Sequence, residues 1–237
     1  MIAGVREPYD WARVLAWLGT RAIPGLEEVR DGLYRRGGLA VRFADGGLLV
    51  EGEAEADVVA RVFDAGHDPA VLAEAWGDSA EASALLARSP GIRVPGAWGG
   101  WELAVRAVLG QQVSVAGARK TAEKLVALHG GAFPQAEALI DGPLPGMPAA
   151  RQRSLRALAA AVAGGLRLDP PLDLAATRVE LLDLPGIGPW TVEYVAMRAL
   201  RDPDAWPASD LWLRRADVDA GALRPFRAYA AMLIWQP

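Results

Sequence analysis

The stretch that decides the fold is VELLDLPGIGPWTVEYVAMRAL, residues 179–200. It predicts a short helix up to Leu184, a tight turn over residues 185–188, and a second helix that begins with Pro189. Glycine adopts backbone conformations that other residues avoid, so the two glycines permit a tight turn. Proline is favoured at the first position of a helix because its missing N–H is not needed there. The sequence therefore predicts two helices joined by a hairpin.

The turn of this hairpin consists of Pro185, Gly186, Ile187 and Gly188. Such a turn exposes backbone N–H groups beside a helix N-terminus, where partial positive charge accumulates and a phosphate can bind. Phosphate contacts carry no base-sequence information, which suits a protein that inspects DNA everywhere. A bare Gly-x-Gly turn fits an ordinary αα-hairpin equally well. The complete LPGIG followed by Pro-Trp is more specific and favours a DNA-binding helix-hairpin-helix.

The chain around this hairpin is predicted to be helical from Trp98 onward, because no convincing strand follows that residue and Gly and Pro separate the segments. Helices are expected over residues 101–109, over residues 114–128 with Ser114 as the N-terminal cap, and over residues 149–163. The second part of the chain therefore reads as all-α.

The first part of the chain mixes helices and strands. Residues 9–18 and 55–65 have helical patterns, whereas residues 39–43 and 48–50 are predicted to form a hairpin that reverses at residues 45–47. This small antiparallel sheet with helices is expected to end near Pro90-Gly91. The predicted fold class is α+β, with a mixed α/β N-terminal domain over residues 1–90 and an all-α domain over residues 91–237.

The composition excludes several classes of protein. The chain has no cysteine, which rules out disulfides, thiolate zinc sites, iron–sulfur clusters and a cysteine nucleophile. His67 and His129 are its only histidines, too few for a histidine-rich metal site, and both are expected at the surface or in loops. Neither an export signal nor a membrane-spanning apolar run is evident. We therefore expect a cytoplasmic protein.

The net charge of −4 argues against an indiscriminate polyanion binder. Residues 1–97 hold ten basic and fifteen acidic side chains, whereas residues 98–237 hold fifteen basic and fourteen acidic ones. A DNA-facing surface is therefore expected on the second part, although so small an asymmetry carries little weight alone.

Four separated segments, in the same order, closely resemble bacterial 3-methyladenine DNA glycosylase II, of the helix-hairpin-helix DNA glycosylase superfamily. They are PYDWARVLAWLGTRAI (8–23), VRAVLGQQVSVAGARKTAEKL (105–125), LPGIGPWTVEYVAMRAL (184–200) followed by Asp210, and PFRAYAAMLIW (225–235). The resemblance implies a mixed α/β domain joined to an all-α helix-hairpin-helix glycosylase domain. It also implies a monofunctional, monomeric enzyme that excises 3-methyladenine and 7-methylguanine from damaged double-stranded DNA by base flipping, thereby initiating base excision repair. No cofactor is implied as a requirement.

By this resemblance Asp210 is the catalytic carboxylate. An alkylated purine already carries positive charge, so it leaves without a proton, and the enzyme needs a negative group near the developing oxocarbenium sugar. Local sequence alone favours another role, because Ser209 and Asp210 precede an apolar helix that either could cap. The complete motif reverses that preference.

The resemblance places Trp190, Tyr194 and Trp235 in the base pocket, where electron-rich rings attract an electron-poor base. Ordinary core packing is the expectation for the other aromatic residues considered, namely Trp17, Trp101, Trp206 and Trp212. The pocket is expected to be open, aromatic and poor in polar groups.

The resemblance also implies contacts with DNA by the hairpin turn and by the loop that holds Gln111 and Gln112. In the family this loop inserts a wedge, usually leucine, into the gap left by the flipped nucleotide, and the matching position here is Gln112. The alternative is an ordinary turn between helices. Main-chain carbonyls of Leu182, Leu184 and Ile187 are implied as ligands of a monovalent cation, Na⁺ or K⁺.

Two further features bear on the reaction. Trp190 stands where lyase relatives carry a Schiff-base lysine, and the only lysines of the chain are Lys120 and Lys124, which favours base removal without strand cleavage. The segment between Arg215 and Arg224 is shorter than in the family, which leaves open whether Trp235 reaches Asp210. The alternatives are a glycosylase for uracil, hypoxanthine or mismatched bases, or a non-catalytic DNA-damage-binding protein.

Overall fold

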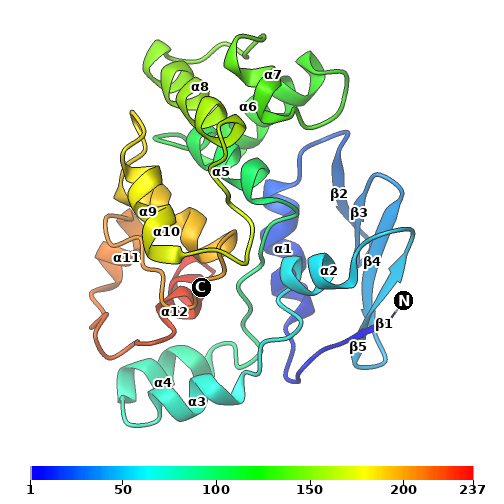
Figure 1. The fold of residues 1–237 in the computed structure, drawn as a ribbon. Helices are drawn as coiled ribbons and strands as arrows, with labels where there is room; N and C mark the ends of the chain where they lie inside the picture. Colours follow the sequence, from blue (N-terminus) through cyan, green and yellow to red (C-terminus); the bar gives the residue numbers. More distant parts are fainter. Residues whose placement is uncertain (1, 237) are drawn as a thin grey trace.

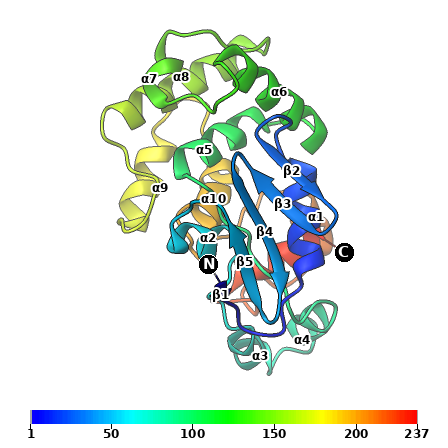
Figure 2. The ribbon, with the colours of Figure 1, turned by 90° about the vertical axis from the view of Figure 1, so that its right-hand side faces the viewer.

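The computed structural model describes residues 2–236. Its N-terminal part is a five-stranded antiparallel sheet with strand order β1-β5-β4-β3-β2, seen face-on in Figure 2. The strands are β1 (Ile2–Gly4), β2 (Glu27–Arg30), β3 (Leu33–Arg36), β4 (Leu39–Ala44) and β5 (Gly47–Glu51). The predicted hairpin is confirmed as β4 and β5, in which Val41 pairs with Val50.

The strands turn at two-residue loops that the sequence encodes directly. Asp45 and Gly46 have φ of 52° and 70°, and Asp31 and Gly32 have φ of 53° and 75°. Positive φ at both central residues matches the right-handed twist of the flanking strands, which explains the Asp-Gly pairs. The β2–β3 hairpin was missed because its strands, EEVR and LYRR, are short and charged, yet its Asp31-Gly32 turn carried the signal.

Helix α1 (Trp11–Arg21) packs against β2 and β3. It begins two residues later than predicted because Asp10 serves as its N-terminal cap and accepts a hydrogen bond from the Arg13 N–H (3.0 Å). One face of α1, including Trp17 and Leu18, is buried. The opposite end of this helix, at Arg21, lies beside the helical part of the chain, where α1 contacts α6.

The rest of the chain is helical, as predicted. Ser114 caps its helix, and the helix over residues 149–163 has the predicted bounds. Two predicted helices are shorter than expected: the one predicted over residues 55–65 spans Ala56–Val62, and the one predicted up to Leu184 ends at Leu182. The helices are α2 (Ala56–Val62), α3 (Ala70–Trp76), α4 (Ala80–Ala87), α5 (Gly100–Leu109), α6 (Val115–Leu128), α7 (Ala136–Ile140), α8 (Ala149–Ala163), α9 (Leu174–Leu182), α10 (Pro189–Arg198), α11 (Leu211–Ala216) and α12 (Arg227–Trp235). In Figure 1 helices α9 to α12 lie to the left of the sheet, α6 to α8 lie at the top of the molecule, and α3 and α4 lie at the lower left.

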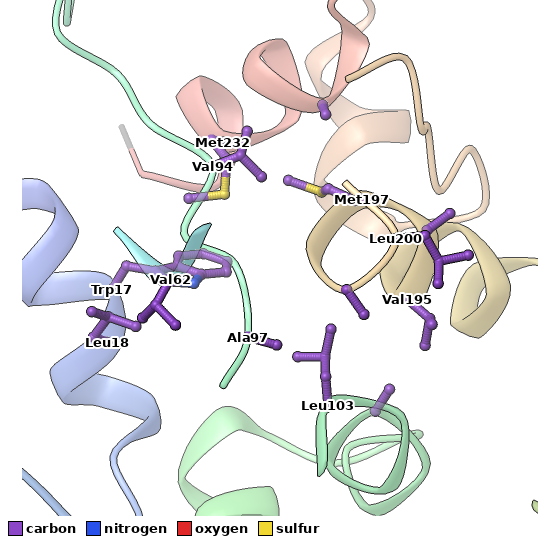
Figure 3. Close-up of a cluster of buried hydrophobic side chains, with 14 of the residues drawn as sticks. Trp17, Leu18, Val62, Val94, Ala97, Leu103, Val195, Met197, Leu200 and Met232 are labelled. Atoms are coloured by element: carbon purple, nitrogen blue, oxygen red, sulfur yellow. The ribbon is translucent and has the colours of Figure 1, made fainter. Parts of the chain in front are cut away.

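The hydrophobic core is continuous between the two parts of the chain. Helix α4 packs against α12, and the Trp76 indole donates to the Leu223 carbonyl (3.0 Å). Figure 3 shows Trp17 and Leu18 of α1 in the same buried cluster as side chains of α5, α10 and α12. The division at residue 90 remains a prediction.

A buried cluster of four charged side chains ties the sheet to α5. Glu27 of β2 pairs with Arg36 of β3 and Arg106 of α5, and both arginines also pair with Glu102 of α5. Glu27 is 8% exposed and also accepts from the Tyr34 hydroxyl (2.7 Å). The C-terminal end of α1 and the start of the helical part are thereby fixed relative to each other, because Glu27 also accepts from the Ile23 N–H just after α1.

No helix within residues 2–236 is long and apolar enough to cross a membrane.

Candidate active site

The hairpin turn lies between α9 and α10, with Pro189 as the first residue of α10. Gly186 has φ of 76°, and a Cβ atom there would lie 2.0 Å from Ser154 Oγ of α8, so this position excludes other residues on two grounds. The side chain of Ile187 is buried at 5% exposure, and its N–H donates to the Leu184 carbonyl (3.1 Å). Ile187 thus anchors the turn, while Pro185 and Gly186 face solvent.

The loop between α5 and α6 is fastened to the hairpin by Gln111. Its side-chain amide donates to the Gly186 carbonyl (2.9 Å) and to Thr191 Oγ1 (3.1 Å). Gln112, the next residue, is exposed and has φ of 57°, in the left-handed region. The two glutamines therefore differ: Gln111 joins two loops, and Gln112 projects from the surface that they form.

The three carbonyls implied as cation ligands lie at the C-terminal end of α9 and in the turn. The Leu184 carbonyl accepts from the Ile187 N–H, whereas those of Leu182 and Ile187 accept no hydrogen bond within the described residues. Carbonyls at a helix C-terminus carry partial negative charge, so the donor set fits a monovalent cation. Within residues 2–236 no group of three or more His, Asp or Glu side chains is arranged to hold a metal ion.

Asp210 is held by four donors from three parts of the chain. Its Oδ1 accepts from the Trp212 N–H (2.9 Å), the Leu213 N–H (3.3 Å) and the Trp235 indole (3.0 Å). Its Oδ2 accepts from the Trp190 indole (3.0 Å). The carboxylate thus caps α11, as local sequence suggested, and also contacts both tryptophans that the resemblance singled out.

The three predicted pocket aromatics lie together beside Asp210. Tyr194 stacks on Trp190 with ring centroids 5.1 Å apart and planes at 9°, and its ring lies 6.2 Å from that of Trp235. Trp235 in turn stacks on Trp17, with centroids 5.8 Å apart. Trp235 reaches Asp210 although the segment between Arg215 and Arg224 is short, because α11 and α12 pack directly against each other.

These residues line a cavity of about 430 Å³, large enough for a purine. Its walls come from α1, α5, α6, α10, α11, α12 and the α5–α6 loop. The residues with the chemistry relevant below are Trp17, Arg21, Arg106, Arg119, Trp190, Tyr194, Arg198, Asp210, Trp212 and Trp235.

Two expectations about this cavity were wrong. Trp212 was expected in the core but is 61% exposed at the cavity wall, because α11 presents it on the side away from buried Leu213. Trp17 is buried, as expected, but it also lines the cavity. The expectation that the pocket is poor in polar groups fails because four arginines line it.

Arg21 and Arg198 determine the electrostatics around Tyr194. Arg198 Nη1 lies 2.8 Å from Tyr194 Oη, and the Arg21 guanidinium lies 3.2 Å from the centre of the Trp17 ring. Burial raises the pKa of the Tyr194 phenol, but the positive charges of Arg198 and Arg21 outweigh it and lower this pKa to about 8. Burial lowers the pKa of Arg21 to about 10. Sequence reasoning missed both arginines, although Arg21 follows Trp17 by four residues on one helix face.

His67 lies in the loop after α2, in agreement with the expectation of a surface or loop residue. It is partly buried and its ring stacks on that of Tyr229, with centroids 4.0 Å apart. Burial lowers the pKa of His67 to about 4. The loop that holds His67 folds against α12, which buries part of the ring.

Similarity to solved structures establishes the fold. A 3-methyladenine DNA glycosylase from Archaeoglobus fulgidus has a TM-score of 0.80 over 99% of this chain and 97% of its own, at 18% identity. An 8-oxoguanine glycosylase/lyase from Clostridium acetobutylicum, in complex with double-stranded DNA containing cytosine opposite 8-oxoguanine, has a TM-score of 0.71 over 96% of this chain and 91% of its own, at 14% identity. Structural relatives of this fold therefore bind damaged double-stranded DNA.

Sequence similarity establishes the family. Residues 3–60 match the family described as the AlkA N-terminal domain. A protein of Mycobacterium tuberculosis described as a probable bifunctional transcriptional activator/DNA repair enzyme AlkA is 38% identical over 98% of this chain, which spans 55% of that protein's length. DNA-3-methyladenine glycosylase 2 of Escherichia coli K12 is 31% identical over 96% of this chain and 94% of its own. The chain therefore belongs to the AlkA-type 3-methyladenine DNA glycosylase II family, within the helix-hairpin-helix glycosylase superfamily.

Proposed function

We propose that this protein is a monofunctional DNA glycosylase that excises alkylated bases, of the 3-methyladenine and 7-methylguanine type, from duplex DNA and so initiates base excision repair. The observation that carries the proposal is the carboxylate of Asp210. It lies in the wall of a purine-sized aromatic cavity and is oriented by two indole donors and a helix N-terminus.

The reaction needs a fixed negative charge more than it needs an acid. An alkylated purine is cationic before it leaves, and cleavage of its glycosidic bond moves positive charge onto the sugar. Oδ1 of Asp210 already accepts three hydrogen bonds, whereas Oδ2 accepts one. Oδ2 therefore has free lone-pair capacity, and we assign to it the stabilisation of the sugar cation and the orientation of the attacking water.

We infer base removal without strand cleavage from Trp190, the second residue of α10. A lyase needs an amine at the sugar to form a Schiff base. Trp190 occupies the position where such a lysine would stand, and its indole is engaged by Asp210. Both lysines of the chain lie on α6 and neither lines the cavity.

DNA binding is assigned to the hairpin turn and the α5–α6 loop. The backbone of exposed Pro185 and Gly186 and of half-buried Gly188 is proposed to face the phosphates, with Ile187 as the buried anchor. Gln112 is proposed as the wedge, because it is exposed beside a turn that Gln111 holds in place. A Na⁺ or K⁺ ion at the carbonyls of α9 would strengthen the phosphate contact; no other cofactor is required.

The biological setting proposed is that of a monomer acting on damaged duplex DNA in the bacterial cytoplasm, at the nucleoid. The curated relatives named above are bacterial. Main-chain contacts explain how a chain of net charge −4 can bind a polyanion.

The decisive test measures bases released from duplex DNA that contains 7-methylguanine, by the wild-type protein and by Asp210→Asn. Asparagine also caps helices, so the fold should persist. We expect a single-turnover rate lower by roughly 100–1,000-fold, the effect of removing one transition-state electrostatic contact.

The matched control is Asp173→Asn. Asp173 caps α9 by accepting from the N–H groups of Ala175 and Ala176, and it lies outside the cavity. This variant should keep the wild-type rate. A wild-type protein that binds abasic DNA but releases no base would instead be a damage-binding protein, and strand cleavage would contradict the monofunctional assignment.

A further inference from the structure

Trp212 is the largest exposed apolar side chain within residues 2–236. It is 61% exposed, although tryptophan buries most of its surface in an ordinary folded protein. Val113, in the α5–α6 loop, and Val115, at the start of α6, are also exposed, and all three side chains line the cavity. Side chains that line a cavity and are exposed as well lie where the cavity opens to solvent. These three residues form the apolar rim of the cavity.

The position of Trp212 is fixed relative to the carboxylate. Trp212 follows Asp210 by two residues, and its N–H donates to Asp210 Oδ1 at 2.9 Å. The indole therefore projects from the same first turn of α11 that orients the carboxylate. An exposed apolar patch on a folded protein commonly marks a surface that another molecule covers. A nucleotide whose sugar lies at Asp210 brings the rest of its strand past Trp212.

Unpaired arginines beside the rim indicate the chemistry of that molecule. Arg119 of α6 lines the cavity, and the Arg215 guanidinium of α11 lies 5.9 Å from the centre of the Trp212 ring. Both arginines are exposed, and within the described residues neither pairs with a carboxylate, unlike Arg224, which pairs with Asp204 (2.8 Å). Positive charge next to an exposed aromatic ring fits a nucleic-acid strand, in which phosphates alternate with bases that can stack.

The opened duplex offers a surface that matches Trp212. A flipped nucleotide leaves its neighbours in the strand without a stacking partner. Gln112, the proposed wedge, can fill the gap and form hydrogen bonds, but it has no ring to stack on these bases. Successive bases of one strand are about 3.4 Å apart along the duplex. When the flipped sugar lies at Asp210, a neighbouring base is therefore within reach of a side chain two residues away.

We propose that Trp212 stacks on a base next to the flipped nucleotide and so holds the opened duplex on the enzyme, while Val113 and Val115 cover the other side of the cavity mouth. The inference rests on the proposed glycosylase function and deepens it, because it assigns part of the DNA contact to α11 in addition to the two loops. Every base has a face on which an indole can stack, so the contact tolerates any sequence. Such tolerance suits an enzyme that acts wherever damage occurs.

The first test measures affinity for a duplex with an abasic site by fluorescence anisotropy, over a series of salt concentrations. Trp212→Ala should weaken binding by roughly 10–100-fold, the effect of losing one stacked base. The slope of log affinity against log salt concentration should stay at the wild-type value, because stacking releases no counterions. Leu128→Ala removes another exposed apolar side chain at the opposite end of α6, outside the cavity, and should bind like the wild type.

The second test locates the stacked base. 2-Aminopurine, whose fluorescence falls when another ring stacks on it, is placed on the 5′ side of the abasic site in one duplex and on the 3′ side in another. Binding of the wild type should quench it in one of the two duplexes. Trp212→Ala should leave that probe bright, and Trp212→Phe, which keeps a ring, should restore part of the quenching. A tryptophan with a purely structural role would not give this pattern.

Three results would overturn the inference. These are wild-type affinity in Trp212→Ala, a changed salt slope in that variant, or a probe that the wild type quenches on neither side. Thermal unfolding shows whether Trp212→Ala is folded, as its exposure leads us to expect. If it is not, the comparison of quenching between the wild type and Trp212→Phe decides.

Release of 7-methylguanine by the wild type separates failure of this inference from failure of the proposed function. A wild type that releases the base while Trp212→Ala binds normally contradicts only the role of Trp212. A wild type that binds and quenches as described but releases no base contradicts the glycosylase activity.

Discussion

At the scale of single residues, Asp210 both caps a helix and lines the cavity. Its Oδ1 caps α11 and its Oδ2 is oriented by Trp190 toward the cavity. The local sequence around Asp210 predicted a helix cap, and the longer motif predicted a place in the site. In the structure Oδ1 accepts from the α11 backbone and from Trp235, whereas Oδ2 accepts from Trp190, so one carboxylate is compatible with both interpretations.

Trp235 is expected to contribute to catalysis through its indole N–H as well as its ring. Trp235→Phe keeps an aromatic ring against Tyr194 but removes the hydrogen bond to Asp210 Oδ1. Hydrogen bonds to charged groups contribute about 1.5–3 kcal/mol, so single-turnover release of 7-methylguanine should slow by roughly 10–100-fold. Trp206→Phe, which changes an indole outside the cavity, is the control. Equal rates in the two variants would show that the indole contact does not matter.

His67 is expected to make stability depend on pH. The folded state holds the ring neutral because burial lowers its pKa to about 4, whereas the unfolded chain binds a proton below about 6.5. Its contribution is therefore complete above pH 6.5 and declines as the pH falls toward 4. Between about pH 7.5 and pH 5 the free energy of unfolding should fall by about 2 kcal/mol more in the wild type than in His67→Phe. Urea unfolding at both pH values measures the difference, and parallel losses would contradict it.

At the scale of elements, the strongest local signals were caps and turn residues. Ser114, Pro189 and Gly186 mark helix boundaries or a turn by backbone chemistry that depends only on near neighbours, so these elements were predictable. The strands β2 and β3 were not, because four-residue charged segments acquire their structure from pairing with the sheet and packing against α1. Helices α3 and α4 were not predicted either. Helices this short are not stable alone; α4 is stabilised by packing against α12, and α3 by the contact of Trp76 with the loop before α12.

The α5–α6 loop offers a matched pair of substitutions. Gln112→Ala should leave the melting temperature unchanged and weaken binding to a duplex with an abasic site on the order of tenfold, since the exposed wedge is lost. Gln111→Ala should lower both stability and affinity, because it breaks the bonds to Gly186 and Thr191. Thermal unfolding and fluorescence anisotropy distinguish the two. A Gln112 variant with full affinity would show that this loop is an ordinary turn.

At the scale of the whole molecule, the buried ion cluster fixes the sheet relative to the helices that carry the site. Glu27 lies on β2, while Arg106 lies on α5 and lines the cavity. Burial raises the pKa of Glu27, but Arg106, Tyr34 and Arg36 outweigh it and lower this pKa below its usual value. The cluster thus couples the position of α1, with Trp17 and Arg21, to the rest of the cavity wall.

Glu27→Gln should lower the free energy of unfolding by about 3 kcal/mol, because it leaves buried guanidinium groups partly unpaired. Glu28→Gln, an exposed neighbour on the same strand, should have little effect. Unfolding in urea, followed by tryptophan fluorescence and by circular dichroism, should show one coincident transition in each case, since the core is continuous. Two separate transitions would mean that the parts unfold independently.

The sequence by itself determined the hairpin, the capped helices and the α+β succession, because these rest on local backbone chemistry. It also predicted the carboxylate and its three aromatic neighbours, through separated motifs that together resemble a known family. Only the tertiary structure decided that Trp17 and Arg21 of α1 join Arg198 of α10 around Tyr194. The contact spans more than 170 positions of the chain, as their numbers in the printed sequence show. Which distant side chains meet depends on how whole helices pack, and no local pattern encodes that arrangement. The positive charge that the arginines bring to the cavity therefore could not be predicted from the sequence.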